Sequence, residues 1–156
     1  MGIQGKETIK GNNMNENKYP KYMFNMYNKI DEIAPGASTK INQIPSLPAD
    51  LGIEILSIVL SFACQGTNEA VILLARKEFK EIPPEWTIEN LDSAVKIGID
   101  MDDEWDYLRL LELLYESRTI YINTLNRYIE IGSRSLNKEI QEAAEDFQRI
   151  LKDEES

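Results

Sequence analysis

The sequence contains no histidine and a single cysteine, Cys64, among its 156 residues. Without histidine, Ser-His-Asp and Cys-His catalytic arrangements and imidazole metal sites are excluded. One cysteine supports neither a disulfide framework nor a Cys-rich zinc module. Because Cys64 lies inside an apolar stretch, we expect it to be a small buried hydrophobic residue rather than a nucleophile.

The chain also lacks a long apolar run. Its longest such stretch, residues 55–64, contains Ser57 and Ser61 and is far shorter than the ~20 residues that a membrane-spanning helix needs. The first 14 residues are polar and lack the apolar segment of a secretory signal. Lys6 stands where a myristoylation signal requires Ser or Thr. We therefore expect a cytoplasmic protein that does not enter a membrane.

The N-terminal segment is expected to contribute nothing to the core. We predict a disordered leader or tail over residues 1–17 and a single all-helical domain over residues 18–156. Residues 10–14 read Lys-Gly-Asn-Asn-Met, which a purine-rich ribosome site followed by ATG can encode, so Met14 is a candidate natural start. An ordinary disordered tail explains the same composition.

Charge of one sign dominates the chain. It has 27 acidic and 17 basic side chains, for a net charge of −10. Residues 1–47 hold six basic and four acidic groups, whereas residues 48–156 hold 11 basic and 23 acidic groups, a net charge of −12. An acidic body disfavours binding to a nucleic-acid backbone or to an anionic membrane surface and favours a basic protein partner.

Apolar residues recur at helical spacing in seven segments, and no segment shows the sustained alternation of a strand. The expected helices cover about 20–33, 48–64, 68–82, 88–97, 102–118, 119–131 and 135–152. The fold class is therefore all-α, with about seven helices. The helix over 48–64 is apolar around most of its circumference, which predicts a central, buried position. The aromatic helix before it is expected to pack against it, or else to form a partner or dimer surface.

A weak internal repeat relates the predicted helices. Shifting the chain by 68 residues places Thr67, Ile72 and Phe79 over Ser135, Ile140 and Phe147, and a shift of about 35 gives a similar match. This period predicts stacked antiparallel helical hairpins, in a short HEAT-like array. The alternative is a compact irregular helical bundle, because any two amphipathic helices align when their apolar faces are matched.

The densest chemical feature is an acidic segment around Trp105. A calcium loop that began at Asp100 would need Gly and Glu where Trp105 and Leu111 stand, so calcium binding is not expected. Acids at a helix start satisfy unpaired backbone amides and the helix dipole, and they also suit a protein-docking patch. The candidate partner-binding residues are Asp100, Asp102, Asp103, Glu104, Trp105 and Asp106.

Two carboxylate pairs one helical turn apart, Glu78 with Glu81 and Asp103 with Asp106, resemble all-α nucleotide pyrophosphatases in spacing only. The resemblance would imply Mg²⁺ held between adjacent helices. A solvated helix face is the favoured interpretation of these pairs, and lysines flank the first of them. Arg109 follows Trp105 by four residues, which predicts stacking on the indole or a local ion pair.

These features favour a binding protein without catalytic residues, metal or cofactor. The function we expect is that of an immunity-type inhibitor, which neutralises a basic toxin such as a nuclease by covering its positive groove. The alternatives are a helical scaffold or adaptor protein and, third, a Mg²⁺-dependent all-α hydrolase. The sequence leaves the oligomeric state open.

Overall fold

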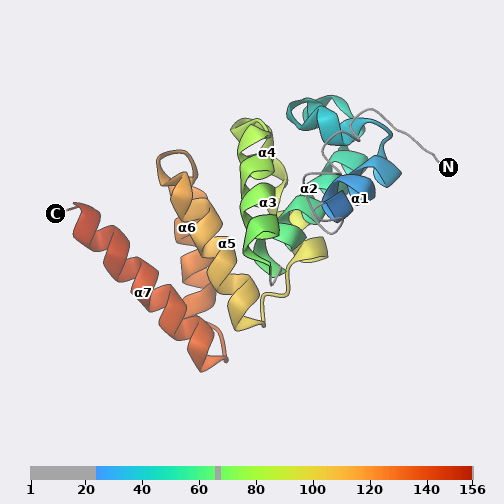
Figure 1. Cartoon of the computed structure of the whole chain (residues 1–156). Helices are drawn as coiled ribbons and strands as arrows, with labels where there is room; N and C mark the ends of the chain where they lie inside the picture. Colours follow the sequence, from blue (N-terminus) through green and yellow to red (C-terminus); the bar gives the residue numbers. More distant parts are fainter. Residues whose placement is uncertain (1–23, 66–67, 156) are drawn as a thin grey trace.

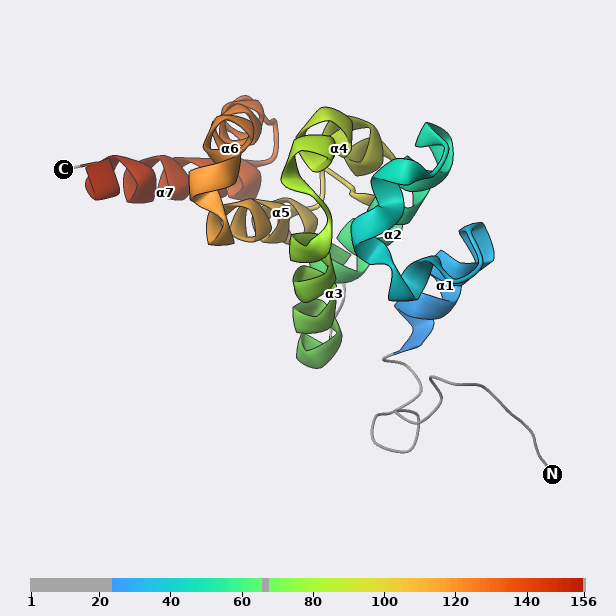
Figure 2. The same cartoon turned by 90° about the horizontal axis from the view of Figure 1, so that it is seen from above.

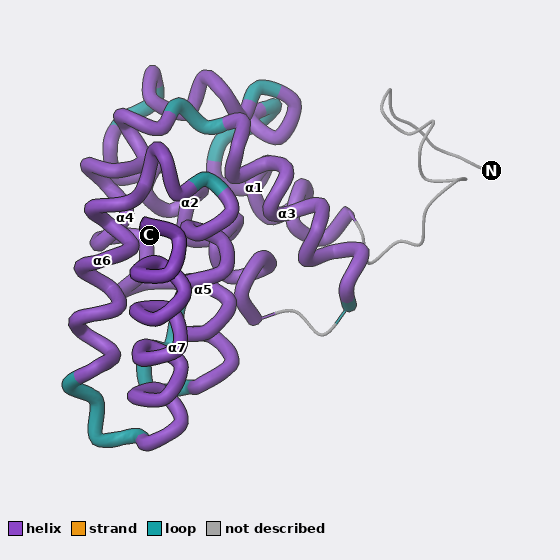
Figure 3. The backbone as a smooth tube through the Cα atoms, turned by 90° about the vertical axis from the view of Figure 1, so that its left-hand side faces the viewer, coloured by secondary structure: helices purple, strands orange, loops and turns teal. Residues whose placement is uncertain are grey.

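A computed structural model describes residues 24–65 and 68–155, and in these ranges the chain forms helices and loops but no strand (Figure 3). The all-α prediction is confirmed, whereas the leader predicted over 1–17 lies outside the described residues. Within the described ranges, seven α-helices and two short 3-10 helices follow one another: α1 (Asn25–Ile33), η3 (Ala37–Thr39), η4 (Ile41–Ser46), α2 (Ala49–Gln65), α3 (Glu69–Glu81), α4 (Pro84–Gly98), α5 (Glu104–Glu116), α6 (Arg118–Ser133) and α7 (Lys138–Glu155).

Several helix boundaries differ from the sequence prediction, and α7 spans Lys138–Glu155 rather than about 135–152. Helix α4 begins at Pro84 rather than near residue 88, because a proline that ends one helix also suits the first position of the next. Helix α6 continues through Gly132 to Ser133, so this glycine does not end the helix. The connection over 34–49, expected to be irregular, contains η3 and η4.

Helix α2 is the centre of the fold. It packs against α1, α3, α4 and α5, and its residues Ile55, Leu56, Val59 and Leu60 are completely buried. The prediction of a central, buried second helix is therefore confirmed, as is the packing of the first helix on it. None of the helices in the described ranges has the length and apolar character needed to cross a membrane.

Ion pairs connect helices α3 to α7 at a nearly constant separation in the sequence. Helices α1 and α7 lie at opposite ends of the molecule (Figure 1), and from above, α4 and α6 lie along one side of α5 and α7 (Figure 2). Four of the ion pairs between helices join residues 35 or 36 apart: Arg76–Glu112, Lys80–Glu116, Asp92–Arg127 and Arg118–Glu154. The two α3–α5 pairs, Arg76–Glu112 and Lys80–Glu116, link side chains one turn apart on each helix.

The predicted hairpins are present in part. Helices α2 and α3 form a packed pair, as do α6 and α7, but α4 packs mainly on α2 while α5 packs on α2 and α6. Gly98 explains the contact between α4 and α2, because a glycine lets the end of α4 approach the backbone of α2 at Ser57. The structure is an all-helical bundle of packed helices, and the HEAT-like label stays a prediction.

Candidate protein-docking site

The acidic segment forms the turn between α4 and α5 and continues into the first residues of α5. Residues 100–106 are together called the acidic turn below. Asp103 is the N-cap of α5, and its Oδ1 accepts hydrogen bonds from the backbone N–H groups of Trp105 and Asp106, both at 3.0 Å. Asp100 Oδ1 accepts from the N–H of Asp102 at 2.9 Å. Two of the six predicted partner-binding residues therefore shape the turn itself, as helix-start acids do.

Asp106 was expected on a solvated helix face, and this is wrong, because it faces the interior of the protein. Its side chain is 7% exposed, and its Oδ2 accepts hydrogen bonds from Gln65 Nε2 at 2.6 Å and from the backbone N–H of Asp100 at 2.9 Å. These bonds fasten the acidic turn to the end of α2. Asp106 thus positions the turn, and a partner that contacts the surface would meet its neighbours instead.

The remaining predicted residues face outward. Asp102 is exposed, Glu104 is half-buried, and the Trp105 indole is 60% exposed. The guanidinium carbon of Arg109 lies 6.0 Å from the centroid of the Trp105 ring, which confirms the predicted contact between these side chains. The acidic turn thus presents a large aromatic surface among carboxylates.

A groove that the sequence did not reveal lies beside the acidic turn. It has a volume of about 570 Å³ and runs between this turn and the connection of α6 to α7. Its walls are joined by a hydrogen bond from Asn137 Nδ2 to the carbonyl oxygen of Asp102, at 3.3 Å. Mostly apolar side chains line it: Met101, Asp102, Tyr107, Ile131, Gly132, Ser135, Leu136, Asn137 and Ile140. We call it the α5–α7 groove.

Tyr107 and Gly132 hold the two helices beneath the groove together. The Tyr107 side chain is completely buried, and its hydroxyl donates to the carbonyl oxygen of Tyr128 at 2.9 Å. Burial raises the pKa of Tyr107 above its ordinary value of 10.0. A Cβ at position 132 would lie less than 3.0 Å from the Tyr107 hydroxyl and ring. Gly132 is therefore a packing residue, which explains why α6 passes through it.

The rim of the groove is open and apolar. Leu136 is fully exposed and Ile131 is 48% exposed. Neither side chain is part of the core. Ile131 directly precedes Gly132, where the sequence predicted the end of the helix, and Leu136 lies in the connection between α6 and α7. Exposed large apolar side chains next to a concave surface are typical of an interaction site. In the sequence, these apolar residues lie outside the helical spacing of the core-facing residues of α6, and this was the one signal that could have indicated the groove.

Glu78 was predicted to lie on a solvated face, and this is wrong. Its side chain is 8% exposed, and its carboxylate accepts a hydrogen bond from the Tyr27 hydroxyl of α1. Burial raises the pKa of Tyr27, and the hydrogen bond and negative charge of Glu78 raise it further. Across the described ranges, no three His, Cys, Asp or Glu side chains lie together as a metal-binding group.

Comparison with known proteins gives no match to any protein family, curated protein or solved structure. Function is therefore inferred from the geometry and chemistry of the acidic turn and the α5–α7 groove.

Proposed function

We propose that this protein is a non-catalytic inhibitor of the immunity type, which binds a basic toxin such as a nuclease and neutralises it. The observation that carries the proposal is the combination of the acidic turn, the exposed Trp105 and the open α5–α7 groove on one part of the surface. A nuclease holds phosphate groups in a positively charged groove. An acidic surface that covers this groove competes with the nucleic acid.

Charge and apolar area would have separate roles in such a complex. Single ion pairs at a protein surface contribute little, but the summed field of a body with a net charge of −12 raises the rate of encounter. Trp105 and the groove supply apolar surface that becomes buried on contact. Buried aromatic residues at the centre of an interface commonly limit dissociation.

The proposal has consequences for location and architecture. An inhibitor of a nuclease protects the cell only where its nucleic acid is, so we place the protein in the cytoplasm of a bacterial cell. A HEAT-like array of stacked hairpins would suit this role, since stacked helical repeats present extended surfaces to protein partners.

The test begins with capture of the partner from source cells and then measures the partner's enzymatic activity as this protein is added. Surface-plasmon kinetics with the captured partner are recorded from 0.1 to 1 M salt, over which the Debye length falls from about 10 Å to about 3 Å. We expect loss of the partner's activity and association that slows markedly with salt. A partner that stays fully active in the complex would refute the proposal, as would association that does not depend on salt.

Matched variants locate the contact. Asp102→Lys with Glu104→Lys should slow association, because both residues belong to the acidic turn and neither caps α5. Glu142→Lys with Glu145→Lys changes the net charge equally at exposed positions of α7 and should have a smaller effect. Trp105→Ala should mainly raise the dissociation rate, since it removes apolar contact area. Equal effects of the two charge reversals would contradict the placement at the acidic turn.

A further inference from the structure

We infer that the α5–α7 groove takes up one large apolar side chain from a cationic segment of a protein partner, with Lys or Arg residues of that segment facing the acidic turn. This inference rests on the proposed function, and it adds the chemistry of the bound segment and its orientation. The partner residue in the groove and the partner cations occupy two adjoining parts of one surface.

The lining of the groove selects an apolar side chain. Its apolar lining residues are Met101, Tyr107, Ile131, Leu136 and Ile140. Because Tyr107 and Ile140 are buried, the apolar surface open to a partner comes from Met101, Ile131 and Leu136. Leu136 is fully exposed on the rim, so a side chain that enters the groove covers it without displacing any contact of the core. Apolar surface removed from water on both sides drives such binding. The volume of about 570 Å³ is large enough for a side chain of Leu, Phe or Trp size.

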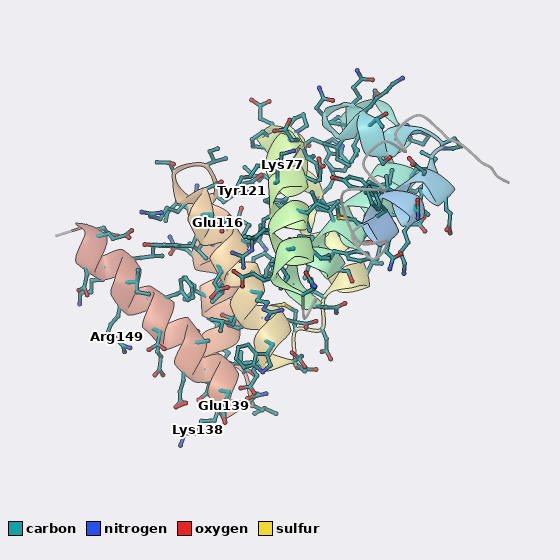
Figure 4. The ribbon with its side chains drawn as sticks, in the orientation of Figure 1. Lys77, Glu116, Tyr121, Lys138, Glu139 and Arg149 are labelled. Carbon is teal, nitrogen blue, oxygen red and sulfur yellow. The ribbon has the colours of Figure 1, made fainter. Side chains whose placement is uncertain are left out.

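The charge around the groove is one-sided. Asp102 is part of the wall that the acidic turn forms, and the exposed Asp100 is its close neighbour. On the opposite wall the charges offset one another, because Arg134 pairs with Glu130 at 3.1 Å and Lys138 lies beside Glu139. Figure 4 shows both of the latter side chains directed outward at the start of α7. Cations of a bound segment are therefore attracted to the acidic-turn side.

The same charge distribution decides between possible occupants. A second copy would bring together the acidic turns of two chains that each have a net charge of −10, and these chains repel each other. A nucleic acid carries the same sign of charge as the acidic turn and gains no counterion release from it. A cationic protein segment with an apolar residue complements both parts of the surface.

The experiment uses the full chain and a fluorescently labelled, amphipathic Leu/Lys helical peptide as the probe, with binding followed by fluorescence anisotropy. Two control peptides have Ser in place of Leu, or Glu in place of Lys. Leu136→Ser should weaken binding of the Leu/Lys peptide about tenfold, which corresponds to about 1.4 kcal/mol. Leu73→Ser is the matched control, since Leu73 is 55% exposed on α3 and distant in sequence from the groove.

Charge is tested in the same assay. Asp102→Asn should weaken binding several-fold at low salt and less at high salt, whereas the exposed Glu145→Gln should leave it nearly unchanged. Backbone amide shifts in NMR spectra should change mainly over residues 101–107 and 131–140. Because the exchanged side chains are exposed, circular dichroism should show unchanged helicity in every variant.

Three outcomes would overturn the inference: no binding of the Leu/Lys peptide, equal binding of the Glu-substituted peptide, or equal weakening by Leu136→Ser and Leu73→Ser. The outcome is separable from that of the proposed function, because the peptide titration needs no toxin. A captured enzyme that is inhibited equally by wild type and by Leu136→Ser and Asp102→Asn variants would leave the inhibitor role standing and remove the groove from it. Peptide binding in the groove without inhibition of any captured enzyme would remove the inhibitor role alone.

Discussion

Gly98 sets the distance between α4 and the central helix, so Gly98→Ala is a direct test of the packing. A Cβ at this position would lie well under 3.0 Å from the carbonyl oxygen of Ser57 and 3.2 Å from its carbonyl carbon, whereas ordinary contact begins at about 3.4 Å. The obstacle is backbone of α2 and cannot rotate away. The two helices would therefore have to separate along a contact that includes completely buried side chains of α2.

The magnitude follows from two opposing terms. Overpacking a close contact costs about 1–3 kcal/mol, and the upper end applies because the backbone must move. Alanine is a better helix former than glycine by about 1 kcal/mol. We therefore expect Gly98→Ala to lower the free energy of unfolding by about 2 kcal/mol, measured by urea denaturation with circular dichroism.

Gly52→Ala is the matched control for the same exchange within a helix. Its Cβ would lie 2.9 Å from the ring of the partly buried Trp86 and 3.2 Å from Cγ2 of the buried Ile44. Both are side-chain atoms, which can move aside more readily than the backbone of a helix. The loss should therefore be clearly smaller than for Gly98→Ala. A Gly98→Ala protein as stable as wild type, or less affected than Gly52→Ala, would refute the close approach of α4 to α2.

Three further predictions concern buried side chains. Phe79→Ala should lower the free energy of unfolding by about 3–5 kcal/mol because it empties a buried aromatic site. Phe62→Ala should lower it less, because this side chain is only partly buried. Equal losses of stability in urea denaturation would contradict the assigned helix faces. Cys64 should react with Ellman's reagent only after unfolding, since burial raises the pKa of its thiol to about 12, and prompt colour from the native protein would refute its burial. The folded protein also holds the hydroxyl proton of Tyr27 more tightly than the unfolded chain, whose tyrosine pKa is about 10. This contribution to stability is complete below about pH 10 and is lost as the pH rises towards the folded-state pKa. The melting temperature should therefore fall less steeply with alkaline pH in Tyr27→Phe than in wild type. Parallel slopes would show that neither burial nor Glu78 raises the pKa of Tyr27 in the folded protein.

The helices and many of their ends could be predicted because they depend on neighbouring residues in the chain. Apolar residues at helical spacing define one face wherever that helix packs. Capping is equally local: Asn68 accepts a hydrogen bond from the N–H of Val71, and Asp103 accepts from two amides at the start of α5. Pro84 misled the prediction because one residue type suits both the end of a helix and the start of the next.

The candidate site was predictable only in part. The acidic segment stands out in the sequence, and the exposure of Asp102 and Trp105 agrees with a surface role. The burial of Asp106 was not predictable, because it depends on a contact with Gln65 of another helix.

The sequence by itself determined an all-helical chain with an apolar second helix, an acidic body and a buried thiol, since composition and periodicity are properties of single segments. The tertiary structure alone decided which helices are neighbours. In the packed structure, Glu78 accepts a hydrogen bond from Tyr27, the ring of Tyr107 packs closely against Gly132, and a groove lies between the acidic turn and the start of α7. Each of these features joins residues more than 20 positions apart, and only the packing of the helices against one another brings such residues together.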